Sequence, residues 1–141
     1  MNNAYNFQRV AKMEPLDIID WLNEEFMEEV PVGIETKEDA AAAGRLLGKL
    51  TNTYSYLCAL SAQLSICARA QKQRCITKPN AKDTAKMEEY ERLKNEYDLA
   101  AMRKASVDAF VDIVHQQYAA VSRMVTIKME ADKELMMTPH K

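Results

Sequence analysis

Between residue 84 and Pro139 the chain contains neither glycine nor proline. Apolar and small side chains in this stretch recur at alternating intervals of three and four residues, the heptad spacing of a helix that packs along another helix. The spacing predicts one helix from about Thr84 to Met137, followed by a mobile tail at 138–141. The seam consists of Tyr90, Leu93, Tyr97, Ala100, Lys104, Val107, Val111, Val114, Tyr118, Val121 and Val125.

A second heptad seam precedes the first and predicts another long helix, from about Lys37 to Cys75. Thr36 followed by Asp39 is similar to a helix capping box with aspartate in place of glutamate, and it marks the start of this helix. The sequence ITKPNAKD, residues 76–83, predicts the turn between the two helices. The seam consists of Ala43, Leu47, Leu50, Tyr54, Leu57, Ser61, Leu64 and Ala68.

The first thirteen residues have no clear period, and we expect a loose arm or a short helix there. Residues 15–30 predict an amphipathic helix that begins at Pro15 and is stopped by Pro31 and Gly33. Trp21 does not fit this helix, because it lies among acidic residues, about 60° outside the apolar half of the helical wheel. The apolar half contains Leu16, Ile18, Ile19, Leu22, Phe26, Met27 and Val30.

These elements predict a single all-α domain over residues 1–141, a helical bundle made of a long antiparallel, coiled-coil-like hairpin and a shorter N-terminal helix. A 54-residue helix is about 80 Å long, whereas a compact globule of this chain length is about 37 Å across. The chain therefore forms an elongated hairpin unless the last helix breaks. An elongated hairpin leaves part of its apolar stripe uncovered, which favours self-association or a partner helix.

A tight turn fixes the expected register of the hairpin, in which the numbers of paired positions sum to about 159. This register places His115 opposite the Gly44 region and leaves the end of the last helix, 123–137, to receive the N-terminal helix. It also brings together four polar side chains that could line a pocket between the helices or form a structural hydrogen-bond layer. These are Tyr54, Tyr56, Arg103 and Lys104.

The small net charge of −2 hides two segments of opposite sign. Residues 14–39 hold ten acids and one base, and residues 68–86 hold six bases and one acid. In the hairpin, the basic segment is expected at the tip and the acidic segment at the opposite end. The basic tip predicts a site for phosphate groups of nucleic acid or of a nucleotide, although its bases also suit a solvated helix C-terminus. The candidate phosphate-binding residues are Arg69, Lys72, Arg74, Lys78 and Lys82.

The acidic helix offers a candidate surface for a protein partner. An exposed tryptophan is typical of an interface hot spot, and carboxylates around it favour a partner with a basic surface. The alternative is that Trp21 packs against the N-terminal arm at Tyr5 or Phe7, or against a second subunit. The candidate partner face consists of Trp21, Asp17, Glu24, Glu25 and Glu28.

Signatures of catalysis, cofactor binding and metal binding are missing from the sequence. It contains no glycine-rich phosphate loop, nucleophile elbow, HExxH or EF-hand pattern, so we expect no enzyme activity and no cofactor. Cys58, Cys67 and Cys75 are odd in number and widely spaced, which favours free thiols on a helix over disulfides or a metal site. No apolar run is long enough for a membrane span and no signal sequence is apparent, so we expect a cytoplasmic protein.

Three segments, WLNEEF (21–26), LLGKLTNTYSYL (46–57) and QQYAAVSRMVTIKMEADKELMM (116–137), resemble small all-α proteins carried by tailed phages and prophages of low-GC bacteria. The resemblance implies the cytoplasm of a host cell and a role in phage recombination, in replication or against host immunity. No functional residue is carried over from it.

Three hypotheses for function follow. The first is a non-catalytic helical protein that inhibits or sequesters a component of host antiviral defence, as an anti-CRISPR protein or a nucleotide sponge does. Its partner is then a host defence protein or a phosphate-bearing ligand. The second is a DNA-binding accessory protein of phage recombination or replication that uses the basic tip. The third is a structural or virion component that assembles as a homo-oligomer.

Overall fold

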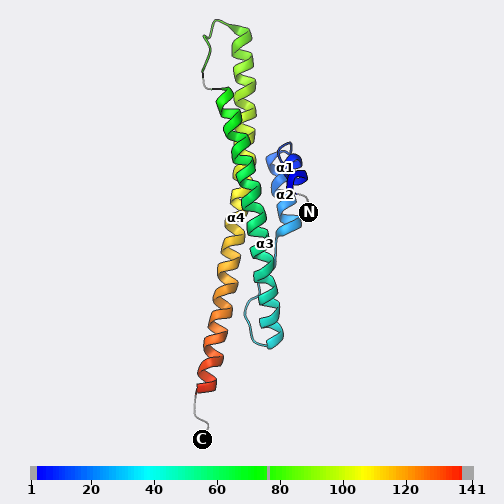
Figure 1. Cartoon of the computed structure of the whole chain (residues 1–141), viewed down its shortest axis with the longest axis vertical. Helices are drawn as coiled ribbons and strands as arrows, with labels where there is room; N and C mark the ends of the chain where they lie inside the picture. Colours follow the sequence, from blue (N-terminus) through cyan, green and yellow to red (C-terminus); the bar gives the residue numbers. More distant parts are fainter. Residues whose placement is uncertain (1–2, 76, 138–141) are drawn as a thin grey trace.

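The described part of the chain folds into four helices that form an elongated rod (Figure 1). The computed structural model describes residues 3–75 and 77–137, with side chains from Asn6 onward, and it contains no strand within those ranges. The prediction of an all-α fold is therefore confirmed. The helices are α1 (Asn3–Val10), α2 (Pro15–Phe26), α3 (Lys37–Arg74) and α4 (Thr84–Met137).

The two long helices α3 and α4 pack against each other along most of their length, as the heptad seams predict. The predicted start of α3 is also confirmed by a complete capping box. The backbone N–H of Asp39 donates to the Thr36 hydroxyl, and the Asp39 carboxylate accepts from the backbone N–H of Thr36, both at 3.1 Å. The predicted tail at 138–141 lies outside the described residues.

The register of the hairpin differs from the expected one by about ten residues. The hydroxyl of Ser61 donates to Asp108, and the ring of Tyr54 lies 6.1 Å from that of His115. Paired positions therefore sum to about 169, and His115 faces Tyr54 rather than the Gly44 region. The tight-turn assumption was wrong because the connection runs in a wide path beside the start of α4, where Thr77 and Pro79 lie near Ala85 and Tyr90.

The N-terminal part forms the short helix α1, the second of the two alternatives for residues 1–13. The helix α2 ends at Phe26 rather than at residue 30, and residues 27–36, called the linker below, contain no helix. Two interactions hold the start of the linker against the hairpin: the Gln117 side chain donates to the carbonyl of Glu28 at 3.0 Å, and Lys49 pairs with the Glu28 carboxylate at 3.0 Å. Pro31 also disfavours a helical conformation at Val30.

The helix α2 lies along the middle of the hairpin, parallel to α4. Arg103 donates to the carbonyl of Met13 at 2.7 Å just before α2, and Gln117 donates to that of Glu28 just after it. The order of these contacts along both segments fixes the direction of α2. The expectation that α2 rests on residues 123–137 is wrong, because the corrected register pairs that part of α4 with the beginning of α3.

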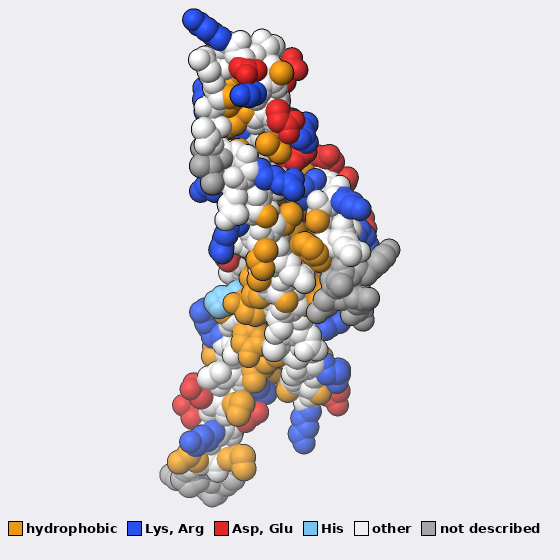
Figure 2. All heavy atoms as spheres, turned by 45° about the horizontal axis from the view of Figure 1, so that its top comes forward, with side chains coloured by type: hydrophobic (Ala, Val, Ile, Leu, Met, Phe, Trp, Pro, Cys, Tyr) orange, Lys and Arg blue, Asp and Glu red, His pale blue; other side chains and the backbone are white. Residues whose placement is uncertain are grey.

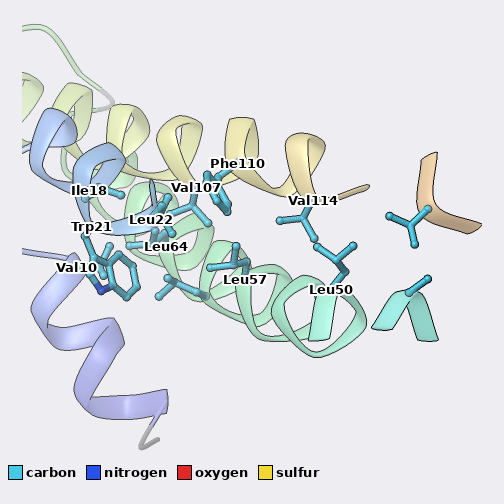
Figure 3. Packing of buried hydrophobic residues seen from close by; sticks show 13 residues of the cluster. Val10, Ile18, Trp21, Leu22, Leu50, Leu57, Leu64, Val107, Phe110 and Val114 are labelled. Carbon is cyan, nitrogen blue, oxygen red and sulfur yellow. The ribbon is translucent and has the colours of Figure 1, made fainter. Parts of the chain in front are cut away.

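The core follows the contact between α3 and α4 and extends under α1 and α2. Val10 of α1 and Ile18, Trp21 and Leu22 of α2 meet hairpin side chains such as Val107 (Figure 3). Since α1 and α2 both lie on one side of the hairpin, the opposite side of the α3–α4 contact has no third layer of helix.

Candidate interaction surfaces

The structure buries Trp21 on the inner side of α2. Only 7% of its surface is exposed; its ring meets Phe26 edge-on at 5.5 Å, and the Arg9 guanidinium lies 5.2 Å from the ring centre. Trp21 therefore packs against α1, and the interpretation of this residue as an exposed hot spot is wrong. The role expected for Tyr5 in this packing lies outside the described side chains.

Burial of Trp21 turns α2 about its axis relative to the orientation predicted from the sequence. Leu16 and Ile19, which the helical wheel assigned to the core, are 75% and 41% exposed. Asp17, Asp20 and Glu24 lie next to them, on one flank of the helical wheel, and make no ion pair within the described part of the chain. These five residues, called the α2 outer face below, combine two aliphatic side chains with three carboxylates.

The other acidic residues of the candidate partner face have different positions. Glu25 is exposed on α2 but lies on the wheel between the buried residues Ile18 and Trp21. Glu28 is in the linker and is paired with Lys49, so it belongs to the contact between the linker and α3. Of the predicted set, only Asp17 and Glu24 remain on the α2 outer face.

The basic segment lies at the tip of the hairpin, as expected, but it is not surrounded by further positive charge. Residues 68–98 carry eight bases and six acids, a net charge of +2, because the corrected register brings the acidic start of α4 to the tip. Arg92 bonds to Glu89 at 2.6 Å and to Glu96 at 2.7 Å, which lowers the pKa of Glu89 through the hydrogen bond from Arg92. The upper part of Figure 2 shows positive and negative side chains mixed there.

The five candidate phosphate-binding residues keep the places that the sequence predicted. Arg69, Lys72 and Arg74 are exposed on the last turns of α3, and Lys78 and Lys82 are exposed in the connection to α4. No described ion pair joins this segment to residues 14–39, so the two charged segments do not neutralise each other. The acidic segment extends from the middle of the rod, where α2 lies, towards the end opposite the tip, where α3 begins at Lys37 (Figure 1). The expected place is therefore wrong for the acids of α2 and right for those at the start of α3.

The four residues expected to line one polar pocket are dispersed over both sides of the hairpin. Tyr56 packs against Phe26 at 5.7 Å beneath α1 and α2, where burial raises the pKa of its hydroxyl. Arg103 binds the carbonyl of Met13 on that same side. Lys104 is paired with Asp108 and Tyr54 lies near His115, both on the uncovered side. The shared pocket is therefore not formed.

A shallow groove of about 300 Å³ does lie between α3 and α4 on the uncovered side. The groove was not expected from the sequence, because the expected register pairs other residues of the two helices. Tyr54 has a raised pKa there, chiefly through its hydrogen bond with the Cys58 thiol. The groove is lined by Leu50, Thr51, Tyr54, His115 and Tyr118.

This groove is the centre of a longer surface that we call the open face. It runs along one flank of both hairpin helices, and its members are exposed or half-buried. Hydrophobic side chains gather along the middle of the rod in Figure 2. The open face consists of Leu47, Thr51, Tyr54, Cys58 and Ser61 of α3 and of Lys104, Asp108, Val111, His115, Tyr118, Ser122 and Val125 of α4.

Neither a metal centre nor a membrane span is found among the described residues. Histidine, cysteine, aspartate and glutamate side chains form no group of three or more that could hold a metal ion there. No helix in the described ranges combines the length and the hydropathy needed to cross a bilayer. Cys58, Cys67 and Cys75 are half-buried free thiols.

The fold thus defines an all-α protein built on a long antiparallel hairpin with two short helices on one side. Comparisons of the chain with protein-family models, with curated proteins and with solved structures find no match.

Proposed function

We propose that this chain is a non-catalytic binding protein that attaches to a protein partner through the α2 outer face. The observation that carries the proposal is the exposure of Leu16 and Ile19 on a helix that buries Ile18, Trp21 and Leu22. Exposed aliphatic side chains cost solubility, and their retention beside a row of acids favours a contact surface.

The chemistry of this face defines the partner it suits. Asp17, Asp20 and Glu24 favour a surface rich in lysine and arginine, which speeds association and fixes orientation. Leu16 and Ile19 require an apolar depression within that basic surface, because aliphatic side chains gain binding energy only when water is excluded from them. A nucleic-acid-binding groove that contains apolar side chains among its lysines and arginines is a surface of this kind.

The finer proposal is that the partner belongs to host antiviral defence. It is supported by the resemblance of residues 21–26, 46–57 and 116–137 to phage and prophage proteins, and by the acidic character of the α2 outer face. Nucleic-acid-guided defence enzymes carry basic grooves, so an acidic protein can compete there with nucleic acid. A nucleotide-binding role at the tip is less favoured, because acids accompany the bases over residues 68–98.

A phage plating assay tests this proposal. The chain is expressed in a low-GC bacterium that carries one defined defence system at a time, beginning with CRISPR–Cas systems, and is then challenged with a targeted phage. We expect plating efficiency to rise by a factor of ten or more against one system. The double variant Leu16→Asp, Ile19→Asp is expected to lose this effect while keeping its helical circular dichroism.

Leu135→Asp provides the matched control, because Leu135 is a similarly exposed leucine near the C-terminal end of α4. It is expected to protect the phage as well as the unmodified chain does. Full protection by the double variant would show that the α2 outer face is not the binding surface. No protection against any system of the panel would refute the finer proposal.

A further inference from the structure

We propose that the open face binds the same face of a second copy of this chain, so that two antiparallel hairpins form a symmetric dimer with four long helices at its centre. The inference concerns the side of the hairpin opposite α1 and α2. It is therefore independent of the function proposed for the α2 outer face.

The accessible surface of the chain is too large for a compact monomer of this mass. It amounts to 10071 Å² for 16.1 kDa, whereas compact monomers of that mass expose about 7,400 Å². The excess of about 2,700 Å² is well above the 800 Å² that each partner buries in a standard interface. An interface of ordinary size therefore fits within the surplus.

The charge pattern of the open face suits an interface between identical copies. No charged residue occurs between Leu50 and Ala68 of α3, although that stretch spans about five helical turns with exposed positions. Lys104 and Asp108 of the open face pair with each other, and Ser61 donates to the same carboxylate. Asp112, at the edge of this face, is close enough to Tyr54 to help raise its pKa and makes no ion pair among the described residues. When two copies meet, the paired charges therefore keep their partners, and Asp112 of each copy is the unpaired charge that stays at the rim.

The side chains on this face are those that protein interfaces select. Tyrosine is enriched in protein interfaces, and charged residues are depleted at interface cores. In the middle of the open face, Tyr54 and Tyr118 line the groove. A Cβ added to Gly44, one turn before Leu47, meets no atom within 4 Å. No contact within the described residues therefore accounts for the missing side chain at Gly44, and a second helix can approach closely there.

The shape of the face favours a second copy over an unrelated protein. Two antiparallel helices form a flat layer, and a four-helix bundle is completed by another two-helix layer of similar length. The chain itself supplies such a layer, and most dimers use the same patch on both subunits. A twofold axis near Tyr54 and His115 places the Tyr54 ring of each copy at the groove of the other.

Light scattering coupled to size-exclusion chromatography of the full chain tests the dimer. We expect a mass twice that of the 16.1 kDa chain at micromolar concentration. Tyr118→Glu introduces a charge at the centre of the open face at a position already 40% exposed, so it is expected to shift the mass to that of one chain. Ile127→Glu is the control on the same helix, at a 59% exposed position outside the open face, and is expected to stay dimeric.

Each outcome decides the proposal. A monomeric unmodified chain at 100-fold higher concentration, or an assembly larger than two copies, would overturn it. A dimeric Tyr118→Glu variant with native helical circular dichroism would do the same, and so would dissociation by Ile127→Glu. If Tyr118→Glu fails to fold, Tyr54→Glu replaces it, with Ile66→Glu as its control on α3.

Discussion

The orientation of α2 predicts that two leucines on one helix differ sharply in their contribution to stability. Leu22 is fully buried on the inner side of α2, whereas Leu16 is 75% exposed. Replacing a buried leucine by alanine removes its transfer free energy and leaves a cavity, at a cost of about 3 kcal/mol. The same replacement at an exposed site changes the free energy of unfolding by less than about 0.5 kcal/mol.

The single tryptophan of the chain makes the measurement direct. Because Trp21 of α2 is buried against α1, its fluorescence reports whether these two helices are packed on the hairpin. With a urea dependence of about 2 kcal/mol per molar, Leu22→Ala is expected to lower the midpoint of the fluorescence transition by about 1.5 M.

Leu16→Ala serves as the control for this experiment and is expected to leave the midpoint within about 0.3 M of the unmodified value. Helical circular dichroism, which comes mainly from α3 and α4, shows whether the hairpin unfolds together with α1 and α2. Equal shifts for the two variants, or a larger shift for Leu16→Ala, would refute the orientation of α2 described above.

Three further predictions follow from single contacts. Hydrogen bonds from the backbone N–H groups of Glu35 and Thr36 lower the pKa of Asp39, so the Asp39 carboxylate stabilises the fold fully above its ordinary pKa of 3.8 and loses this effect as the pH falls below that value. Asp39→Asn is therefore expected to weaken the dependence of the thermal midpoint on acid pH. An unchanged dependence in this variant would contradict the prediction. Arg103→Met removes the bond to the Met13 carbonyl and is expected to cost about 2 kcal/mol in the Trp21 fluorescence assay, whereas the exposed control Arg123→Met costs little. The mixed charge of the tip predicts no salt-sensitive shift of double-stranded DNA in a gel; a shift that vanishes with added salt would restore the DNA-binding hypothesis.

Local signals predicted the long helices well, because each signal depends only on neighbouring residues. The capping box at Thr36 and Asp39 marks the start of α3, and the heptad seam with no glycine or proline defines α4. The end of α2 was wrong by four residues because contacts from distant side chains, such as Gln117 on the Glu28 carbonyl, compete with continued helix there.

The orientation of α2 and the register of the hairpin could not be predicted from the periodicity of a single segment, because both depend on contacts with other helices. The helical wheel placed Trp21 outside because it could not include α1, which supplies Val10 and Arg9 as neighbours. The hairpin register was wrong because the path of the connection, and not its length alone, decides which residues face each other. The candidate polar pocket failed for the same reason, since its members were paired through that register.

The uninterrupted helix α4 also determines how far apart attached molecules are held. Its 54 residues span about 80 Å without a glycine or proline at which the backbone could hinge. Anything bound at the connection before α4 therefore stays remote from anything bound near Met137, with α1 and α2 between them. Labels placed at the two ends of α4 are therefore expected to lie about 80 Å apart.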